Sequence, residues 1–148
     1  MIDQKLLKIV SIILLLAISF MCCKDDNPTE PQYDSSLVGN WKVSSMSWDG
    51  PTESGNYDQS QLDSVGVIWN LNFKLDNTAE QITNLSGATI TQAGTWINSG
   101  NMLTLNLKAP TSDQIGTIKY VYIIDGDLLK LNWTLGDGTI FDAEFTKQ

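Results

Sequence analysis

The sequence predicts an all-β protein, and the expected architecture is an eight-stranded antiparallel up-and-down barrel. Two observations lead to this fold class. Apolar and polar residues alternate along residues 65–76, which is the period-2 pattern of a strand with one buried face. Short turn-forming segments then separate further strands, and no convincing helix is found beyond residue 36. A meander with one apolar face hides its edges by closing into a barrel, and a β-sandwich is the alternative.

The first expected strand begins near Gly39 and carries Trp41 and Val43 on its apolar face. The alternation slips by one residue at positions 44–45, which predicts a bulge. Gly39 has no Cβ and lets the indole of Trp41 close over the chain, so we expect Trp41 in the core. Residues 49–64 are rich in turn formers and predict a long loop, and such loops are usually functional.

The later strands are joined by turns that set their register. Turns are expected at residues 76–77, 99–100, 125–126 and 136–138. They predict three apolar cross-strand pairs, namely Trp96 with Leu103, Tyr122 with Leu129, and Trp133 with Phe141. Alternate loops of a meander share an end. The tight turns therefore predict one pinched end, and the longer loops predict an open end covered by residues 49–64.

Composition excludes several functions. The 148 residues suffice for one domain, the net charge is -8, and the chain has neither histidine nor arginine. Without histidine, catalysis by an imidazole and metal binding through an imidazole are excluded. An acidic chain without arginine is not expected to bind nucleic acid. We find no nucleophile with a base, no phosphate loop and no metal-ligand spacing. The expectation is a monomeric protein that is not an enzyme and has no cofactor.

The N-terminal segment predicts export. Lysines precede an apolar run over residues 9–20, which has the proportions of a secretory signal. The run ends at Cys22 and Cys23, and this arrangement resembles the lipobox of bacterial lipoproteins, in which a cysteine becomes the lipidated first residue. Either cysteine fits. The expected organisation is a signal peptide at 1–22, a flexible linker at 23–36 and a barrel domain at 37–148.

The segment Cys23-Lys24-Asp25-Asp26 looks like the charged tag that follows the lipidated cysteine in surface-exposed lipoproteins of some Gram-negative bacteria, and the spacing matches with Cys22 as the lipidated residue. That resemblance implies an outer-membrane lipoprotein of the cell envelope, attached to the membrane by its lipid.

Three short motifs resemble those of the lipocalin-like domains found in exported bacterial lipoproteins. They are the Gly-x-Trp of residues 39–41, the Phe-x-x-Asp-Asn-Thr of residues 73–78, and the Gly-Thr-Trp to Gly-Asn-x-Leu hairpin of residues 94–103. The resemblance makes Gly39 and Trp41 structural residues. In lipocalins an arginine late in the barrel packs over this tryptophan, and Lys147 is the nearby cation here. The resemblance implies binding of a small hydrophobic molecule inside the barrel.

Eight strands enclose a space that side chains can fill or that can hold one small ligand. A two-residue turn at 76–77 would turn Glu80 inward opposite Phe73, and Gln92 would lie inward opposite Leu107. Both polar groups would need partners. The expected ligand-binding residues are Trp69, Phe73, Glu80, Gln92, Tyr120, Tyr122 and Trp133. The alternatives are a filled interior and a surface module that presents its loops, with Trp48 among them, to a protein or glycan.

Overall fold

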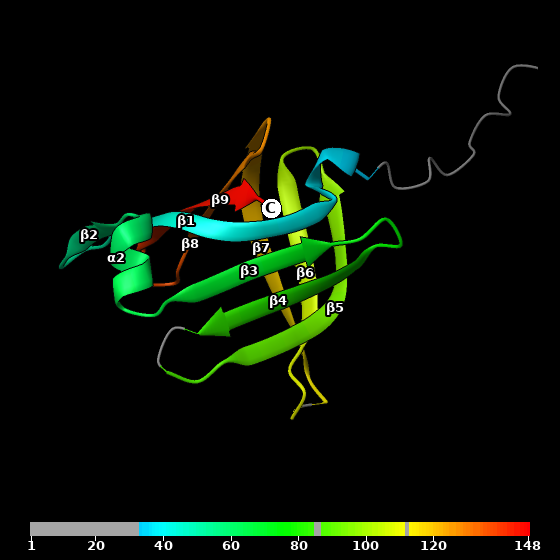
Figure 1. The fold of residues 1–148 in the computed structure, drawn as a ribbon, viewed down its shortest axis with the longest axis horizontal. Helices are drawn as coiled ribbons and strands as arrows, with labels where there is room; N and C mark the ends of the chain where they lie inside the picture. The colour runs from blue at the N-terminus through cyan, green and yellow to red at the C-terminus, as the bar shows by residue number, and fades with distance from the viewer. Residues whose placement is uncertain (1–32, 85–86, 112) are drawn as a thin grey trace, which may run out of the picture. The chain divides into compact units, whose positions relative to one another are not determined.

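The computed structural model describes residues 33–84, 87–111 and 113–148, and it confirms the all-β barrel (Figure 1). The described sheet has nine strands, and the wall closes because the first strand, β1 (Gly39–Asp49), pairs with the last, β9 (Ile140–Lys147). Short β2 (Ser54–Tyr57) pairs only with β1, so the other eight strands form the barrel. The wall continues in chain order through β3 (Ile68–Phe73), β4 (Thr78–Asn84), β5 (Ile90–Ser99), β6 (Met102–Lys108), β7 (Ile115–Asp125) and β8 (Leu128–Thr134).

Strand β1 is bulged where its apolar alternation slips. Its register against β9 shifts between Val43 and Ser45, and the Ser44 hydroxyl donates a hydrogen bond to the Glu144 carbonyl at 3.1 Å. The bulge restores the phase, so Met46 and Trp48 return to the side that carries Trp41. On its other edge β1 pairs first with β3 and then with β2. The predicted bulge is confirmed.

Residues 49–64 are ordered into a hairpin and a helix, so the expectation of a long irregular loop is wrong. β1 and β2 form the hairpin, and α2 (Gln59–Ser64) follows. Asp58 caps the helix through a reciprocal capping box with Gln61. The helix has only six residues and a single fully buried side chain, Leu62. So short a segment has no apolar periodicity to reveal it.

The β3–β4 turn has three residues rather than two, which changes the predicted faces of β4. The Lys74 amide donates to the Thr78 carbonyl at 3.0 Å, and Asn77 adopts a φ of 65° between them. An odd number of turn residues reverses the faces of the strand that follows. Phe73 therefore pairs with Ala79 instead of Glu80, and Leu75, expected on the apolar face, is 79% exposed in the turn.

The next two tight turns each start one residue later than expected. Gly100 and Gly126 both have a φ of 58° and occupy the first central position, the place that glycine takes in type II′ turns. Trp96 consequently pairs with Leu105, and Tyr122 pairs with Leu131. The pairs shift by two residues, so every side chain keeps its predicted face. The Trp133–Phe141 pair across the β8–β9 turn is confirmed.

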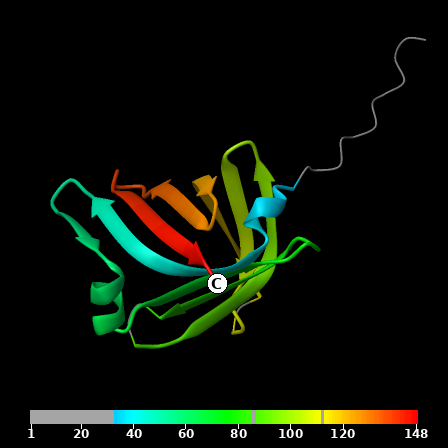
Figure 2. The ribbon, with the colours of Figure 1, turned by 45° about the horizontal axis from the view of Figure 1, so that its top comes forward.

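The predicted alternation of tight and long connections is confirmed except at the β8–β9 turn, which has three residues like the β3–β4 turn. The closed end holds the three tight turns, the start of β1, the C-terminus and a 3-10 helix, η1 (Ser35–Leu37) (Figure 2). The open end holds the β1–β2 hairpin, α2 and the β8–β9 turn (Figures 1 and 2). Among the described residues, no helix has the length and apolar character needed to cross a membrane.

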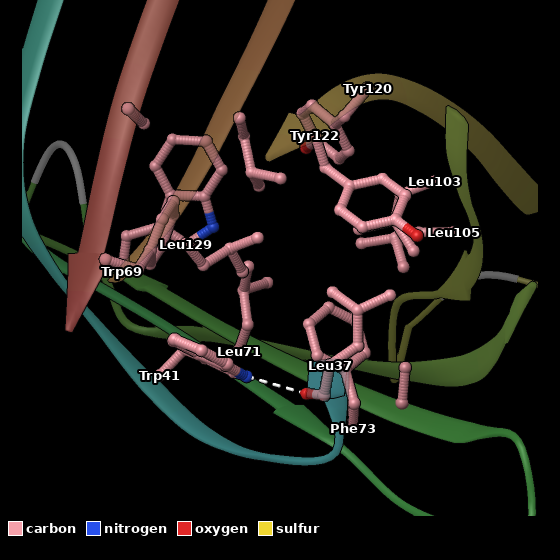
Figure 3. Close-up of a cluster of buried hydrophobic side chains, with 14 of the residues drawn as sticks. Leu37, Trp41, Trp69, Leu71, Phe73, Leu103, Leu105, Tyr120, Tyr122 and Leu129 are labelled. Atoms are coloured by element: carbon pink, nitrogen blue, oxygen red, sulfur yellow. Dashed lines mark hydrogen bonds between the residues drawn. The ribbon is translucent and has the colours of Figure 1, made fainter. Parts of the chain in front are cut away.

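The side chains that face the barrel axis form one contiguous apolar cluster (Figure 3). The cluster includes Leu37 from η1 and Leu62 from α2, so an element at each end contributes to it. Its largest fully buried members are Trp41, Trp96, Phe73, Phe145, Leu37, Leu62, Leu71, Leu103, Leu105, Leu107, Leu129 and Leu131. These side chains favour the alternative of a packed interior, because they fill the centre from opposite walls.

Candidate functional site

The closed end is a structural cap built around Trp41. Its indole is 1% exposed, and Nε1 donates to the Leu37 carbonyl at 2.7 Å. The Lys147 ammonium lies over the same ring, 5.1 Å from its centroid. Lys147 therefore occupies the position over the tryptophan at which an arginine was expected by resemblance. Gly39 makes room, because a Cβ there would stand 2.7 Å from Lys147 Cε. The predicted burial of Trp41 is confirmed.

Tyr122 and Phe73, two of the predicted ligand-binding residues, make their specific contacts with this cap. Tyr122 Oη donates to Asp34 Oδ2 at 3.1 Å and accepts from Asn98 Nδ2 at 3.2 Å. Burial, with the Asp34 carboxylate, raises the pKa of Tyr122 to about 12. Phe73 packs edge-on against Trp96 at 5.5 Å. Residues 33–36, assigned to the linker on sequence, thus pack on the barrel.

The open end carries the candidate site, a chain of ring contacts that we call the aromatic series. It consists of the ring pair Tyr57–Trp48 and the ring cluster Phe141, Trp133, Trp69 and Tyr120, and the two parts are joined by the cross-strand pairing of Trp48 with Phe141. It starts at the surface, where Tyr57 is 39% exposed and lies 5.5 Å from Trp48. Phe141 pairs with Trp48 across β1 and β9 and stacks on Trp133 at 5.0 Å.

Trp133 connects the surface rings to the core. It meets Trp69 edge-on at 5.6 Å and Tyr120 edge-on at 5.5 Å. Trp69 and Tyr120 are buried, whereas Trp133 and Phe141 are only half-buried. Apolar surface that remains half-exposed at the mouth of a barrel is available to a ligand.

A pocket of about 520 Å³ lies at the outer end of the aromatic series. Trp48 and Phe141 supply its apolar wall, and the tips of the β1–β2 and β8–β9 hairpins supply its rim. The rim is partly acidic, with Glu53 and Asp137. Hydrogen bonds from Thr139 hold the pKa of Asp137 below its usual value, so this carboxylate stays charged near neutral pH.

Polar groups lie beside the inner end of the series. Trp69 Nε1 donates to Gln81 Oε1 at 3.3 Å, and Gln81 Nε2 donates to Gln92 Oε1 at 3.1 Å. Tyr120 Oη makes no hydrogen bond with the described residues, and burial raises the pKa of Tyr120 to about 12. This hydroxyl therefore stays protonated at neutral pH and can donate to a ligand.

The register explains which polar residues the sequence misplaced. Glu80 pairs with Asn72 and faces outward, so its expected inward position is wrong, and Gln81 takes the inward place instead. Gln92 lies opposite Gln81 rather than Leu107. A three-residue turn, signalled by the Asp76-Asn77-Thr78 sequence, would have revealed Gln81.

Helix α2 closes the side of the barrel next to the aromatic series. β1 and β3 pair only from Gly39 to Lys42, and beyond that point β1 leaves β3 and pairs with β2. Leu62 of α2 is fully buried in the core, and Lys42 Nζ lies 3.7 Å from Asp63 Oδ1 on the same helix. The helix, rather than a mobile loop, therefore covers this edge.

The remaining predicted residues include the two cysteines. Cys22 and Cys23 lie outside the described residues, so their predicted lipidation stays a prediction. Within the described part of the chain, no group of histidine, cysteine, aspartate and glutamate side chains is arranged to hold a metal ion.

Comparison with known proteins identifies the family. A solved structure of a redesigned β-barrel has 14% sequence identity and a TM-score of 0.49, over 77% of this chain and 93% of that chain. No curated protein sequence matches the chain significantly. The family of lipocalin-like domains matches residues 37–131, which is more than half of the chain. The chain belongs to the lipocalin-like domain family.

Proposed function

We propose that the chain is an exported, membrane-anchored lipoprotein whose barrel binds a small hydrophobic molecule at its open end without catalysing a reaction. Binding of small hydrophobic molecules is the general role that the lipocalin-like fold suggests. The observation that carries the proposal is the aromatic series, which runs from Tyr57 at the surface to Trp69 and Tyr120 in the core. Its outer members, Tyr57, Trp48, Phe141 and Trp133, keep exposed apolar surface that a ligand can cover, and its inner members are packed behind them.

The packed interior places the proposed ligand near the mouth. Leu37, Trp96 and Leu103 are fully buried toward the closed end of the barrel. Their side chains fill the space that a ligand would need there. Trp133 and Phe141 are half-buried and stack on each other, and Phe141 lines the pocket of about 520 Å³ at the mouth. A ligand of modest size would cover these two rings, and Tyr120 Oη would orient a polar end of the ligand.

Binding is tested by titrating the protein with fatty acids, sterols and an aromatic probe such as anilinonaphthalene sulfonate. We expect saturable quenching of tryptophan fluorescence, because Trp133 would contact the ligand. Phe141→Leu should weaken binding about two- to tenfold, since one aromatic pair contributes about 0.5–1.5 kcal/mol. The matched control is Tyr33→Leu, which removes a ring at the closed end and should leave the affinity unchanged. No saturable quenching with any probe would refute the proposal.

The membrane anchor is a separate part of the proposal. We propose that Cys22 or Cys23 carries the lipid, that residues 1–22 are the signal peptide, and that the protein lies in the outer membrane of the cell envelope. Several acyl chains at about 0.8 kcal/mol per buried CH₂ hold a protein firmly. The double variant with alanine at both positions should therefore leave the membrane fraction. A double variant that still sediments with membranes would contradict the anchor.

A second candidate function is supported by the exposed end of the aromatic series. Trp48 and Tyr57 form a ring pair on the hairpin that projects from the barrel, beside the acidic rim of the pocket. Such a hairpin could present its rings to a protein or glycan. Tyr57→Ser removes the exposed ring, which does not line the pocket; it should weaken partner capture under this alternative and leave tryptophan quenching by a small ligand intact.

A further inference from the structure

A second concave site lies on the outer wall of the barrel, where β1, β3 and β4 run side by side (Figure 1). The register arranges outward side chains in two rows across the three strands. The first row is Asn40, Asn72 and Glu80, and the second is Lys42, Asn70 and Ile82. Side chains directly opposite on neighbouring strands lie within contact reach. They line a depression of about 210 Å³, which we call the outer groove.

Two polar side chains that line the outer groove have partners: Lys42 Nζ lies 3.7 Å from Asp63 Oδ1, and Gln148 Nε2 donates to the Thr146 carbonyl at 3.2 Å. The other four differ. The side chains of Asn40, Asn70, Asn72 and Glu80 make no hydrogen bond with the described residues. Asn70 Oδ1 is in addition buried from solvent and accepts nothing. A buried acceptor without a donor costs free energy, so it needs a partner that the chain itself does not supply.

Other polar pairs on the outer wall behave differently. Asn132 Nδ2 donates to Asp142 Oδ1 at 2.9 Å across β8 and β9. Thr117 Oγ1 donates to Asn106 Oδ1 at 2.8 Å across β6 and β7. Asn72 and Glu80 are likewise direct cross-strand partners on β3 and β4, but their side chains make no hydrogen bond with each other. The unpaired polar groups of the outer groove are therefore a local feature rather than a property of the whole wall.

The chemistry of the outer groove favours a ligand rich in hydroxyl groups. Each asparagine amide presents a donor and an acceptor side by side, which match neighbouring hydroxyls of a ring. Glu80 accepts hydroxyl protons, Lys42 donates to ring oxygens, and Ile82 offers an apolar contact to C–H groups. A volume of about 210 Å³ equals that of about seven waters at about 30 Å³ each, which is enough for one sugar ring.

We propose that the outer groove binds one hydroxylated sugar ring, held by the amides of Asn70 and Asn72 and the carboxylate of Glu80. The site is independent of the proposed ligand site at the open end, because its side chains point away from the barrel axis. Asn70 Oδ1 is buried from solvent in the free protein, so the Asn70 side chain turns toward the groove when a sugar hydroxyl donates to it.

The test uses the full-length chain in a detergent without a sugar head group. Side-chain amide resonances of Asn70 and Asn72 are followed by NMR while glucose, N-acetylglucosamine or glycine is added. Either sugar should produce saturable shifts at both amides, and glycine should produce none. Asn70→Leu should weaken sugar binding at least tenfold without lowering the unfolding midpoint, because it breaks no bond within the chain.

Two further variants complete the test. Asn72→Leu should cause a similar loss of sugar affinity and serves in place of Asn70→Leu if that variant fails to fold. Asn132→Leu, on the far strands of the wall, should leave sugar binding unchanged. The proposal is overturned if neither sugar gives a saturable shift, if glycine alone gives one, or if both groove variants bind sugar as the unaltered chain does.

Discussion

Removal of the Trp41 ring should bring the barrel close to unfolding. Trp41→Ala is expected to lower the free energy of unfolding by about 3–5 kcal/mol, the range for deleting a buried large aromatic side chain. The structure places the cost near the top of that range. The ring is 1% exposed, and its removal also leaves the Leu37 carbonyl without the 2.7 Å bond from Nε1. Domains of this kind have a total stability of about 5–15 kcal/mol.

The contribution of the cation over the ring can be separated with a double-mutant cycle. Lys147→Met keeps most of the side-chain stem and removes the charge that lies 5.1 Å from the Trp41 centroid. We expect Trp41→Leu and Lys147→Met to be coupled by about 0.5–1 kcal/mol, the range for an exposed cation–π pair. The assay is urea unfolding followed by far-UV circular dichroism, on a chain that starts at residue 31. Costs that add within about 0.3 kcal/mol would refute the role given to Lys147.

Three further predictions concern the strands, a turn and the buried tyrosines. Gly94→Ala should lower the free energy of unfolding by about 3 kcal/mol, because its Cβ would lie 1.8 Å from the Asn106 carbonyl oxygen; an unchanged thermal midpoint would contradict this. Asn77 has a φ of 65°, a left-handed conformation that glycine tolerates and valine does not. Asn77→Gly should therefore leave the thermal midpoint nearly unchanged, whereas Asn77→Val should lower the free energy of unfolding by about 1–2 kcal/mol. Tyr120 and Tyr122 have pKa values raised from 10.0 to about 12, so their contribution to stability is complete below pH 10 and is lost as the pH rises to about 12. The test uses the double variant Tyr33→Phe and Tyr57→Phe, because the chain has four tyrosines; tyrosinate absorbance that appears near pH 10 in this variant while it stays folded would contradict that last expectation.

The fold could be predicted because apolar and polar residues alternate along the strands that form the barrel. Trp69 and Phe73 were predicted on the inner face of β3, and both side chains are buried in the structure. The pairings after Gly100 and Gly126 are shifted by two residues from those predicted, which changes the cross-strand partners but not the faces. The side chains predicted to face the core on these strands therefore do so. The bulge near Ser44 was visible as a slip in the same alternation.

The candidate site was predicted only in part, and the errors have two causes. The three-residue turn at Asn77 reversed the faces of β4, which moved Glu80 outward and brought Gln81 inward. Helix α2 was missed because six residues around Leu62 carry no repeated apolar spacing. The turn was signalled by the residues around Asn77 and was assigned the wrong length, whereas the helix depends on tertiary burial of Leu62, which a local pattern does not encode.

The proposed function rests on the claim that an apolar ligand binds at the open end. The most direct measurement is a crystal structure of the chain soaked with anilinonaphthalene sulfonate or with the fatty acid that quenches its fluorescence most strongly. We predict ligand density against Phe141 and Trp48, which line the pocket of about 520 Å³, on the outer side of the Phe141–Trp133 stack. Density elsewhere on the barrel, or an open end that stays free at saturating ligand, would contradict the claim.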